Sequence, residues 1–268
     1  YGLDTISVGS TLAWVMEAYE HGDLTKDQLD GLEATWGNAE FMVQMTEKIA
    51  KNEGAGEHLR NGIKYAVEHF GVGQAYDTTA GGIEPGMHDG RLSNGYARIF
   101  QFDPTPGRHV KSGNAGAGQD AEDRISSDLF MLALTELANT TGMCFFFHAF
   151  LGPQAFTDGI LKQVENVTGF KFSQEEMMQT GQRIYAARHL FNLREGETRK
   201  DKTISPRLVG NPPLDRGPLK GVVVDNERRG DEFYTSLGWD LQSLVPSKEA
   251  MDALGGLEAY YADLKYEV

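Results

Sequence analysis

Residues 173–196 read SQEEMMQTGQRIYAARHLFNLREG, and this segment carries the start, face and stop signals of one long helix. Ser173 followed by Glu176 is a capping box, a pair that satisfies backbone N–H groups at a helix start. Apolar side chains then recur on one face of the predicted helix: Met177, Ile184, Ala187 and Phe191. Gly196 ends the pattern, so we expect an amphipathic helix that packs this face against a core.

Helical periodicity also covers most of the chain on both sides of this segment. The predicted helices cover residues 4–19, 25–28, 39–51, 59–70, 120–138, 143–151, 153–167, 231–237, 247–254 and 257–265. Residues 130–134 are apolar on every side, which predicts a centrally buried helix. Residues 222–224 are one candidate strand. We therefore expect an all-α fold with two packed helical domains and long glycine-rich loops, comprising residues 1–78 and 79–268.

Residues 71–118 differ from the helical segments because they contain eleven glycines in 48 residues and few periodic apolar positions. Irregular segments of this length inside compact domains tend to be either functional or disordered. Aromatic side chains in the segment argue against disorder: Tyr76, Tyr96, Phe100 and Phe102. Glycine also lets the backbone approach a ligand closely, so we expect a loop that shapes a ligand site.

The composition narrows the class of protein and its partners. The chain has 268 residues and a formal net charge of −14, which repels nucleic acid and anionic membrane surfaces. Its single cysteine excludes an internal disulfide and a secreted disulfide scaffold. No apolar run approaches the roughly 20 residues that span a bilayer. We expect a cytoplasmic protein that binds neither nucleic acid nor membrane.

Cys144 is the first candidate for chemistry. It is either a small buried hydrophobic residue or a soft-metal ligand, since thiolates bind zinc and iron–sulfur clusters. One cysteine cannot hold a cluster alone, so the second interpretation requires cysteines outside this chain. His148 lies four residues later and would share a helix face with Cys144. A core histidine is favoured over half a zinc site, because no second Cys–His pair is present.

His109 is the second candidate, because Pro104, Pro106 and Gly107 restrict the backbone just before it. Such rigidity helps to aim a titrating side chain at a substrate, although a surface-loop histidine is equally consistent with the pattern. Lys111 lies close enough in sequence to help hold an anion. The following residues 113–118 resemble a nucleotide loop, but the strand and βαβ unit that such a loop needs are absent.

One short pattern occurs twice in the chain. Gly2-Leu3-Asp4 and Gly142-Met143-Cys144 each place a glycine, a larger apolar residue, and then Asp or Cys at a predicted helix start. Helix N-termini offer free backbone N–H groups that suit anionic or acceptor-rich ligands. Two such ends could bind two copies of one ligand.

With these motifs the sequence resembles the aldehyde ferredoxin oxidoreductase family, whose members carry tungsten or molybdenum on two pterins. Residues 2–9, which begin Gly-Leu-Asp, are similar to the family's first pterin-binding motif, Asp-x-x-Gly-Leu-Asp. Residues 139–144 are similar to the second, Asp-x-x-Gly-Leu-Cys. His109 and Lys111 fall where the family has a His-x-Lys/Arg segment near the metal. Residues 183–196 are similar to a family helix that ends in Phe-Asn-x-Arg-Glu-Gly.

The resemblance implies an oxidoreductase that converts an aldehyde or other small carbonyl substrate to a carboxylic acid. Two electrons would pass from a tungsten or molybdenum bis-pterin centre through a [4Fe-4S] cluster to ferredoxin or an electron-transfer subunit. By resemblance, His109 exchanges a proton with the substrate or with oxygen on the metal, and Cys144 is also the fourth ligand of the cluster. The residues assigned to the pterins are Gly2, Leu3, Asp4, Lys111, Asn139, Gly142, Met143 and Cys144.

The resemblance covers the family's two C-terminal helical domains, the first of them incomplete. It does not cover the N-terminal β-sheet domain or the Cys-x-x-Cys-x-x-x-Cys run, so we expect a part of a longer chain, with homo-oligomerisation left open. Three positions depart from the family pattern, one of them Lys202, which stands where a second Asp is usual. Asn139 replaces an aspartate, and an amide oxygen is a poorer acceptor for pterin N–H groups than a carboxylate. Asp89-Gly90-Arg91 stands where relatives often have Asp-Pro-Arg.

Two other functions remain open at this point. The first is a benzoyl-CoA reductase-type member of the same superfamily, which reduces an aromatic acyl thioester, and residues 71–118 could be shaped for either substrate. The second is a non-catalytic helical binding module, in which Cys144 is a core residue. Metal analysis separates the enzymes from the module, and substrate assays separate the two enzymes.

Overall fold

The computed structural model describes residues 1–109, 121–144, 146, 151–262 and 264. The chain divides into two compact units, and each unit is described by itself. Unit 1 consists of Tyr1–Leu92 and Thr203–Val224. Unit 2 consists of Ser93–Lys202 and Asp225–Val268. Each unit is therefore built from two separate stretches of the chain.

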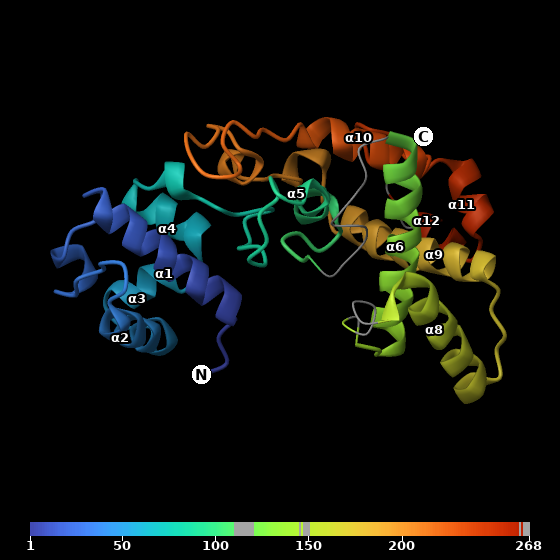
Figure 1. The fold of residues 1–268 in the computed structure, drawn as a ribbon, viewed down its shortest axis with the longest axis horizontal. Helices are drawn as coiled ribbons and strands as arrows, with labels where there is room; N and C mark the ends of the chain where they lie inside the picture. Colours follow the sequence, from blue (N-terminus) through green and yellow to red (C-terminus); the bar gives the residue numbers. More distant parts are fainter. Residues whose placement is uncertain (110–120, 145, 147–150, 263, 265–268) are drawn as a thin grey trace. The chain divides into compact units, whose positions relative to one another are not determined.

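Unit 1 is a cluster of four α-helices with connecting turns (Figure 1). The α-helices are α1 (Thr5–Glu20), α2 (Ala39–Lys51), α3 (Ala55–Leu59) and α4 (Ile63–Phe70), with 3₁₀ turns at Asp27–Leu29, Gln74–Tyr76 and Pro206–Val209. Helix α1 packs against α2 and α4 around a core that includes Trp14, Phe41 and Met45. The predicted helix 59–70 is interrupted because Gly62 is left-handed (φ 86°), and α4 starts after it.

The domain boundary predicted near residue 78 lies inside unit 1. The loop that follows this point pairs with the returning segment of the same unit. The Gly81 N–H donates to the carbonyl of Thr203 at 2.8 Å, and the Ser205 N–H donates to that of Thr79 at 2.8 Å. Residues 79–92 are therefore held in unit 1 by a segment that is distant in sequence.

Unit 2 is built around the long helices α6 (Ala121–Thr141) and α9 (Gln174–Arg194), which pack against each other (Figure 1). Among the described residues, the other α-helices of unit 2 are α5 (Asn94–Phe102), α8 (Pro153–Thr168), α10 (Asn226–Ser236), α11 (Lys248–Leu254) and α12 (Glu258–Ala262), with a 3₁₀ turn at Arg199–Asp201. The capping box that starts α9 is confirmed, since Ser173 and Glu176 bond each other's backbone N–H at 2.7 and 3.1 Å. Of residues 130–134, for which the all-round apolar pattern predicts burial, Phe130 is half-buried and 131–134 are buried.

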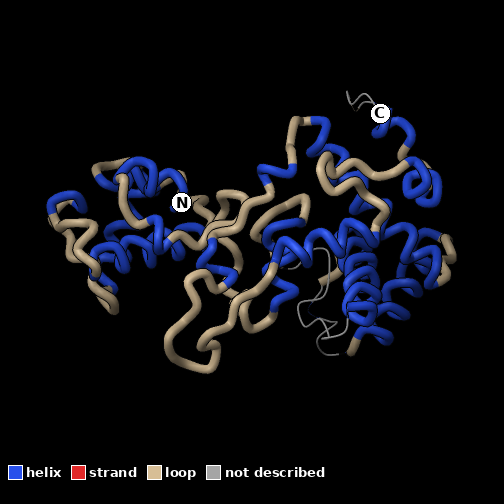
Figure 2. The backbone as a smooth tube through the Cα atoms, turned by 90° about the horizontal axis from the view of Figure 1, so that it is seen from above, coloured by secondary structure: helices blue, strands red, loops and turns tan. Residues whose placement is uncertain are grey.

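The described residues contain helices, turns and isolated bridges but no β-strand, so the all-α prediction is confirmed (Figure 2). Residues 222–224 form no strand, which corrects the strand predicted there. Helix α5 was missed because it begins Asn94-Gly95, inside the glycine-rich segment. In the described part of the chain, no helix combines the length and the apolar character needed to cross a membrane.

Candidate functional site

The first glycine motif forms the turn that leads into α1. Gly2 is left-handed, with φ 75°, and the Asp4 carboxylate accepts a hydrogen bond from the Ser7 N–H at 2.9 Å. Asp4 is therefore the N-cap of α1, and Leu3 packs against the core of unit 1. The expectation that this motif opens a helix is confirmed, and its side chains are fixed by capping and packing.

The second glycine motif closes α6. Gly142 is left-handed, with φ 72°, and the Met143 N–H donates to the carbonyl of Ala138 at 3.0 Å. This pairing is the usual way of satisfying carbonyl groups at a helix C-terminus. Met143 packs against Phe156 and its neighbours, whereas Asn139 and Cys144 are exposed. The helix predicted to start here falls mostly on residues outside the described ranges.

The two turns share one backbone feature, which is the left-handed glycine. A Cβ atom added to Gly2 or to Gly142 would meet nothing within 4 Å. No neighbouring atom would block a side chain at either position. Glycine is therefore favoured there by the positive φ alone. The open space beside each glycine leaves room for a ligand to approach the backbone. Gly2 lies in unit 1 and Gly142 in unit 2.

His109 lies at the end of a tight turn after α5. The Gly107 N–H donates to the carbonyl of Phe100 at 2.9 Å, and the Thr105 N–H donates to the buried Asp103 carboxylate at 2.7 Å. The His109 ring stands edge-on to that of Tyr96, with ring centroids 6.1 Å apart. Burial raises the pKa of Tyr96, so this neighbour stays neutral beside the imidazole. Lys111 and His148 lie outside the described residues.

Helix α9 anchors the turn that carries His109, a role that the sequence did not reveal. Asn192 donates to the carbonyl of Pro104 at 2.7 Å. Arg188 donates to Asp103 at 2.9 Å and to the Thr105 hydroxyl at 2.8 Å. Asn192 belongs to the Phe-Asn-x-Arg-Glu-Gly motif at the end of α9. The motif drew attention to this helix end, but it did not indicate that the helix end holds the turn before His109.

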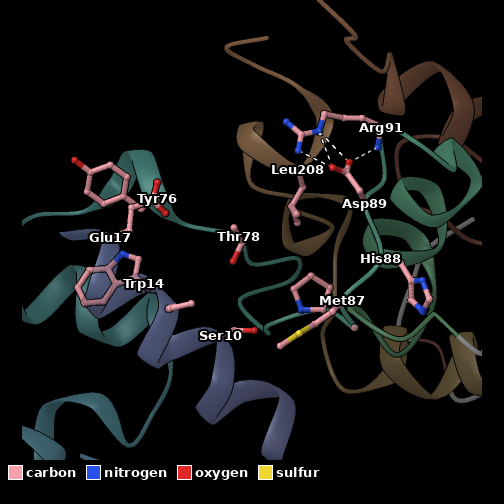
Figure 3. A pocket seen from close by; sticks show the side chains of 13 residues that line it. Ser10, Trp14, Glu17, Tyr76, Thr78, Met87, His88, Asp89, Arg91 and Leu208 are labelled. Carbon is pink, nitrogen blue, oxygen red and sulfur yellow. Dashed lines mark hydrogen bonds and ion pairs between the residues drawn. The ribbon is translucent and has the colours of Figure 1, made fainter. Parts of the chain in front are cut away.

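A pocket of about 370 Å³ opens in unit 1 (Figure 3). One wall is a face of α1, and the opposite wall is the loop 85–91 with Leu208 of the returning segment. The lining residues are Ser10, Ala13, Trp14, Glu17, Tyr76, Thr78, Pro85, Gly86, Met87, His88, Asp89, Arg91 and Leu208. The sequence analysis singled out the loop as functional but did not predict the pocket. The face of α1 that lines it mixes polar, small and aromatic residues, so it gives no recognisable pattern.

The charged residues of this pocket are paired. Arg207 donates two hydrogen bonds to Glu17, at 2.8 and 2.9 Å. Asp89 accepts the Arg91 backbone N–H at 2.8 Å and its guanidinium at 2.7 Å, and this bonding to Arg91 lowers the pKa of Asp89. Although Gly90 stands where relatives often have proline, Asp89 and Arg91 form an ion pair. The pocket wall carries no uncompensated carboxylate among the described residues.

The donor set suits part of a metallo-pterin site. Asp4 and Asn139 have side-chain oxygens that can accept N–H groups, and Cys144 is an exposed free thiol, which corrects the interpretation of it as a core residue. No group of three or more His, Cys, Asp or Glu side chains placed to hold a metal occurs in the described ranges. The chain can therefore supply one soft ligand but not a complete cluster site.

Comparison with known proteins places this geometry in a family. The chain matches the family described as "Aldehyde ferredoxin oxidoreductase, domains 2 & 3" over residues 1–255. It is 30% identical to a tungsten-containing aldehyde ferredoxin oxidoreductase of Pyrococcus furiosus, over 97% of this chain and 44% of that protein. It is 24% identical to the subunit of an aliphatic sulfonate oxidoreductase from the same organism, over 96% of this chain and 41% of that protein.

A solved structure has the same fold. It is the active-site complex of a benzoyl coenzyme A reductase with 1,5-dienoyl-CoA, with a TM-score of 0.70 and 18% identity, covering 98% of this chain and 45% of that one. The chain thus spans less than half the length of the relatives it matches. Because the family match extends over residues 1–255, the chain belongs to the aldehyde ferredoxin oxidoreductase family, in the part described as domains 2 and 3.

Proposed function

We propose that the protein containing this chain is a cytoplasmic oxidoreductase that converts an aldehyde to a carboxylic acid. The observation that carries the proposal is the pair of left-handed glycine turns, Gly2-Leu3-Asp4 and Gly142-Met143-Cys144, in a chain of this family. A tungsten or molybdenum bis-pterin centre, when bound, supplies the two-electron chemistry that side chains cannot perform. A [4Fe-4S] cluster would carry the electrons to ferredoxin or a partner subunit.

The chain's own residues would hold the cofactors through the two turns. Asp4 and Asn139 would accept hydrogen bonds from pterin N–H groups. The open space beside Gly2 and Gly142 would let the pterins approach the backbone closely. Cys144 would give a thiolate to the cluster, and its exposure makes it available as a ligand. Leu3 and Met143 would fix the turns through their packing, and Lys111 would help to hold an anionic group of the cofactor.

His109 would move protons. Oxidation of an aldehyde with one water molecule to a carboxylic acid releases two electrons and two protons, so a base near the substrate speeds the reaction. The Pro104–Gly107 turn, held by Asn192 and Arg188, fixes the backbone that aims the imidazole. The ring would accept a proton as the water oxygen bonds to the carbonyl carbon.

The test uses the full-length protein with its cofactors. His109→Asn is expected to lower kcat for aldehyde oxidation by about 10²–10⁴-fold, with tungsten, molybdenum and iron contents unchanged. His21→Asn, the same change at an exposed histidine, is the matched control and should keep wild-type kcat. Loss of metal together with activity would give His109 a structural role. A wild-type kcat in His109→Asn would contradict the proton-transfer assignment.

A second candidate function is the reduction of an aromatic acyl thioester, as in benzoyl-CoA reductases. The observation that favours it is the aromatic and apolar lining of the unit 1 pocket. Assays with aldehydes and with benzoyl-CoA on the same metal-loaded preparation separate the two. Turnover of the thioester without turnover of any aldehyde would replace the first proposal with the second.

A further inference from the structure

We propose that Arg188 fixes the turn that carries His109 to helix α6, and that it positions His109 for proton transfer through this turn. Arg188 is a positioning residue in this proposal, because it acts through another side chain. The inference rests on the proposed function for the role of His109, but the contact itself can be tested without turnover. All of the residues involved belong to unit 2.

One face of α9 holds the turn that leads to His109. Three side chains on this face, which are three and four residues apart and are therefore neighbours on a helix, donate hydrogen bonds to the turn: Tyr185, Arg188 and Asn192. Together they bind four successive residues, Phe102, Asp103, Pro104 and Thr105. The backbone just before His109 is therefore attached to one rigid helix.

Arg188 also reaches α6, which packs against α9 (Figure 1). One Nη of its guanidinium donates to Glu136 of α6. The other Nη donates to the carboxylate of Asp103 at 2.9 Å and to the hydroxyl of Thr105 at 2.8 Å. Asp103 is fully buried and Glu136 is 2% exposed, and buried carboxylates need a cation or several hydrogen-bond donors. One guanidinium therefore joins two buried carboxylates from different parts of unit 2.

The α6 partner of Arg188 lies close to the second glycine motif. Asn139 follows Glu136 by three residues, roughly 4.5 Å along the helix axis, and Gly142-Met143-Cys144 comes directly after the end of α6. A displacement of about 1 Å in a reacting group can cost about 10²-fold in rate. By joining the turn to α6, Arg188 keeps His109 in register with the helix end that is proposed to hold a pterin and the cluster.

The contact requires the shape of arginine. A guanidinium is a planar fork with donors that point in two directions, so it can bind two carboxylates at once. A lysine ammonium is a point charge, which preserves the compensation of the buried carboxylates but not the fork. Arg188→Lys therefore separates the two roles of the side chain. The fold should be kept, whereas the turn should lose its fixed position relative to α6.

The first test measures turnover of the full-length protein with its cofactors. Arg188→Lys is expected to lower kcat for aldehyde oxidation about tenfold or more, with KM and metal contents unchanged, because the loss falls on the proton-transfer step. Arg183→Lys is the matched control, since Arg183 is half-buried on the same helix but donates to the carbonyls of Leu254 and Gly255. It should keep wild-type kcat. Wild-type kcat in Arg188→Lys, or a loss of metal together with activity, would overturn the positioning role.

The second test measures the turn by hydrogen exchange in the same protein, without turnover. The N–H groups of Thr105 and Gly107 are hydrogen-bonded within the turn and α5, which slows their exchange. In Arg188→Lys, the peptide 103–109 should exchange about tenfold faster than in wild type. Arg183→Lys should leave the exchange of this peptide unchanged. Equal exchange in Arg188→Lys and wild type would overturn the contact.

Glu136→Gln tests the link to α6 from the other side. The amide oxygen still accepts a hydrogen bond from Arg188 but lacks the charge, so kcat should fall about 3–10-fold. The double variant should lose no more than Arg188→Lys alone, because side chains of one network are not additive. Additive losses would overturn the link to α6. If Arg188→Lys does not fold, wild-type kcat and exchange in Glu136→Gln would overturn the proposal.

Contact and function fail separately. Faster exchange of the peptide 103–109 in Arg188→Lys alone, in a protein that oxidises no aldehyde, would overturn the proposed function and keep Arg188 as the residue that fixes the turn. Aldehyde oxidation at the wild-type rate in Arg188→Lys, with unchanged exchange, would overturn the contact and keep the proposed function.

Discussion

His189 is a buried histidine that the structure keeps neutral. Its Nε2 lies 2.9 Å from the carbonyl of Leu244, and because a carbonyl only accepts, the proton is assigned to Nε2. The ring stacks on Trp239, with centroids 4.3 Å apart. Burial, together with a smaller effect of the nearby Lys202 charge, lowers the pKa of His189 from 6.5 to about 3. Protonation in the folded state is therefore strongly disfavoured.

Because His189 is buried and neutral, we predict that the free energy of unfolding falls in mild acid. The unfolded chain binds a proton below pH 6.5 while the folded chain does not, so stability is complete above pH 6.5 and falls as the pH drops toward 3. The cost is about 1.4 kcal/mol per pH unit in that window, or about 2 kcal/mol by pH 5. Urea unfolding of wild type and His189→Gln at several pH values measures the difference in slope.

The variant keeps an N–H donor for Leu244 but does not titrate, so its pH dependence should be flatter than that of wild type. His21→Gln removes an exposed histidine and should keep the wild-type slope. Identical slopes for wild type and His189→Gln would contradict the neutral buried histidine.

Residue patterns predicted local features, such as the start of α1, better than the environment of individual side chains. The repeated pattern predicted two helix starts, which is right for Gly2-Leu3-Asp4 before α1, whereas Gly142 closes α6. The environment of Cys144 could not be predicted in this way, since exposure depends on which elements pack nearby. The pocket at Trp14 was missed for the same reason: its other wall comes from residues more than sixty positions away.

The contact between α6 and α9 depends on one small residue. A Cβ added to Gly181 would lie 2.6 Å from the carbonyl oxygen of Ala133, which is backbone and cannot move aside without moving α6. Gly181 is buried within α9. The two longest helices of unit 2 therefore approach closely because this position has no side chain.

Gly181→Ala is expected to destabilise the protein by about 1–3 kcal/mol, because the added methyl overpacks the helix contact. The matched control is Gly159→Ala in α8, where an added Cβ meets nothing within 4 Å. That change should stabilise by about 0.5–1 kcal/mol, since alanine has the higher helix propensity. Urea unfolding compares the two. A neutral or stabilising Gly181→Ala would mean that α6 and α9 are not in this close contact.

Helices could be predicted where the apolar repeat was clear, and they were missed or given wrong bounds where glycine interrupted the repeat. The capping box and Gly196 gave the start and end of α9 to within two residues. The apolar face predicted for it was wrong beyond Met177, because Phe191 is exposed and the buried side chains include Tyr185 and Leu190. Helix α5 was missed because Gly95 and the glycines before it suggested a continuous loop. The break between α3 and α4 comes from Gly62, whose left-handed conformation is fixed by tertiary contacts. The Glu84 carboxylate, for example, accepts the Ile63 N–H at 2.6 Å.

At the scale of the whole molecule, the cluster assignment depends on residues outside this chain. In the full-length protein, Cys144→Ser should remove or weaken a [4Fe-4S] signal, because a serine oxygen is a poorer soft-metal ligand than a thiolate. Electron paramagnetic resonance of the reduced protein and iron analysis measure the effect. Ser126→Ala in α6 is a control that leaves the sole cysteine in place. An unchanged spectrum in Cys144→Ser would show that this thiol is not a cluster ligand.

The division of the chain into two discontinuous units could not be predicted from sequence patterns. Periodicity describes neighbours along the chain, whereas unit 1 is completed by Thr203–Val224. That segment is fixed by contacts such as the Arg207–Glu17 ion pair and the Ser205 N–H bond to Thr79. These pairs join positions more than a hundred residues apart, and no local signal identifies them.

The discontinuity of unit 1 has a consequence for the order in which the protein forms during translation. Leu208, one wall of the pocket, and Arg207, the partner of Glu17, follow Leu92 only after the whole first stretch of unit 2 has been synthesised. At about 5–20 residues per second, the ribosome needs roughly 5–20 s for that interval. During this time the nascent α1 lacks the segment Thr203–Val224, so unit 1 can be completed only late in synthesis.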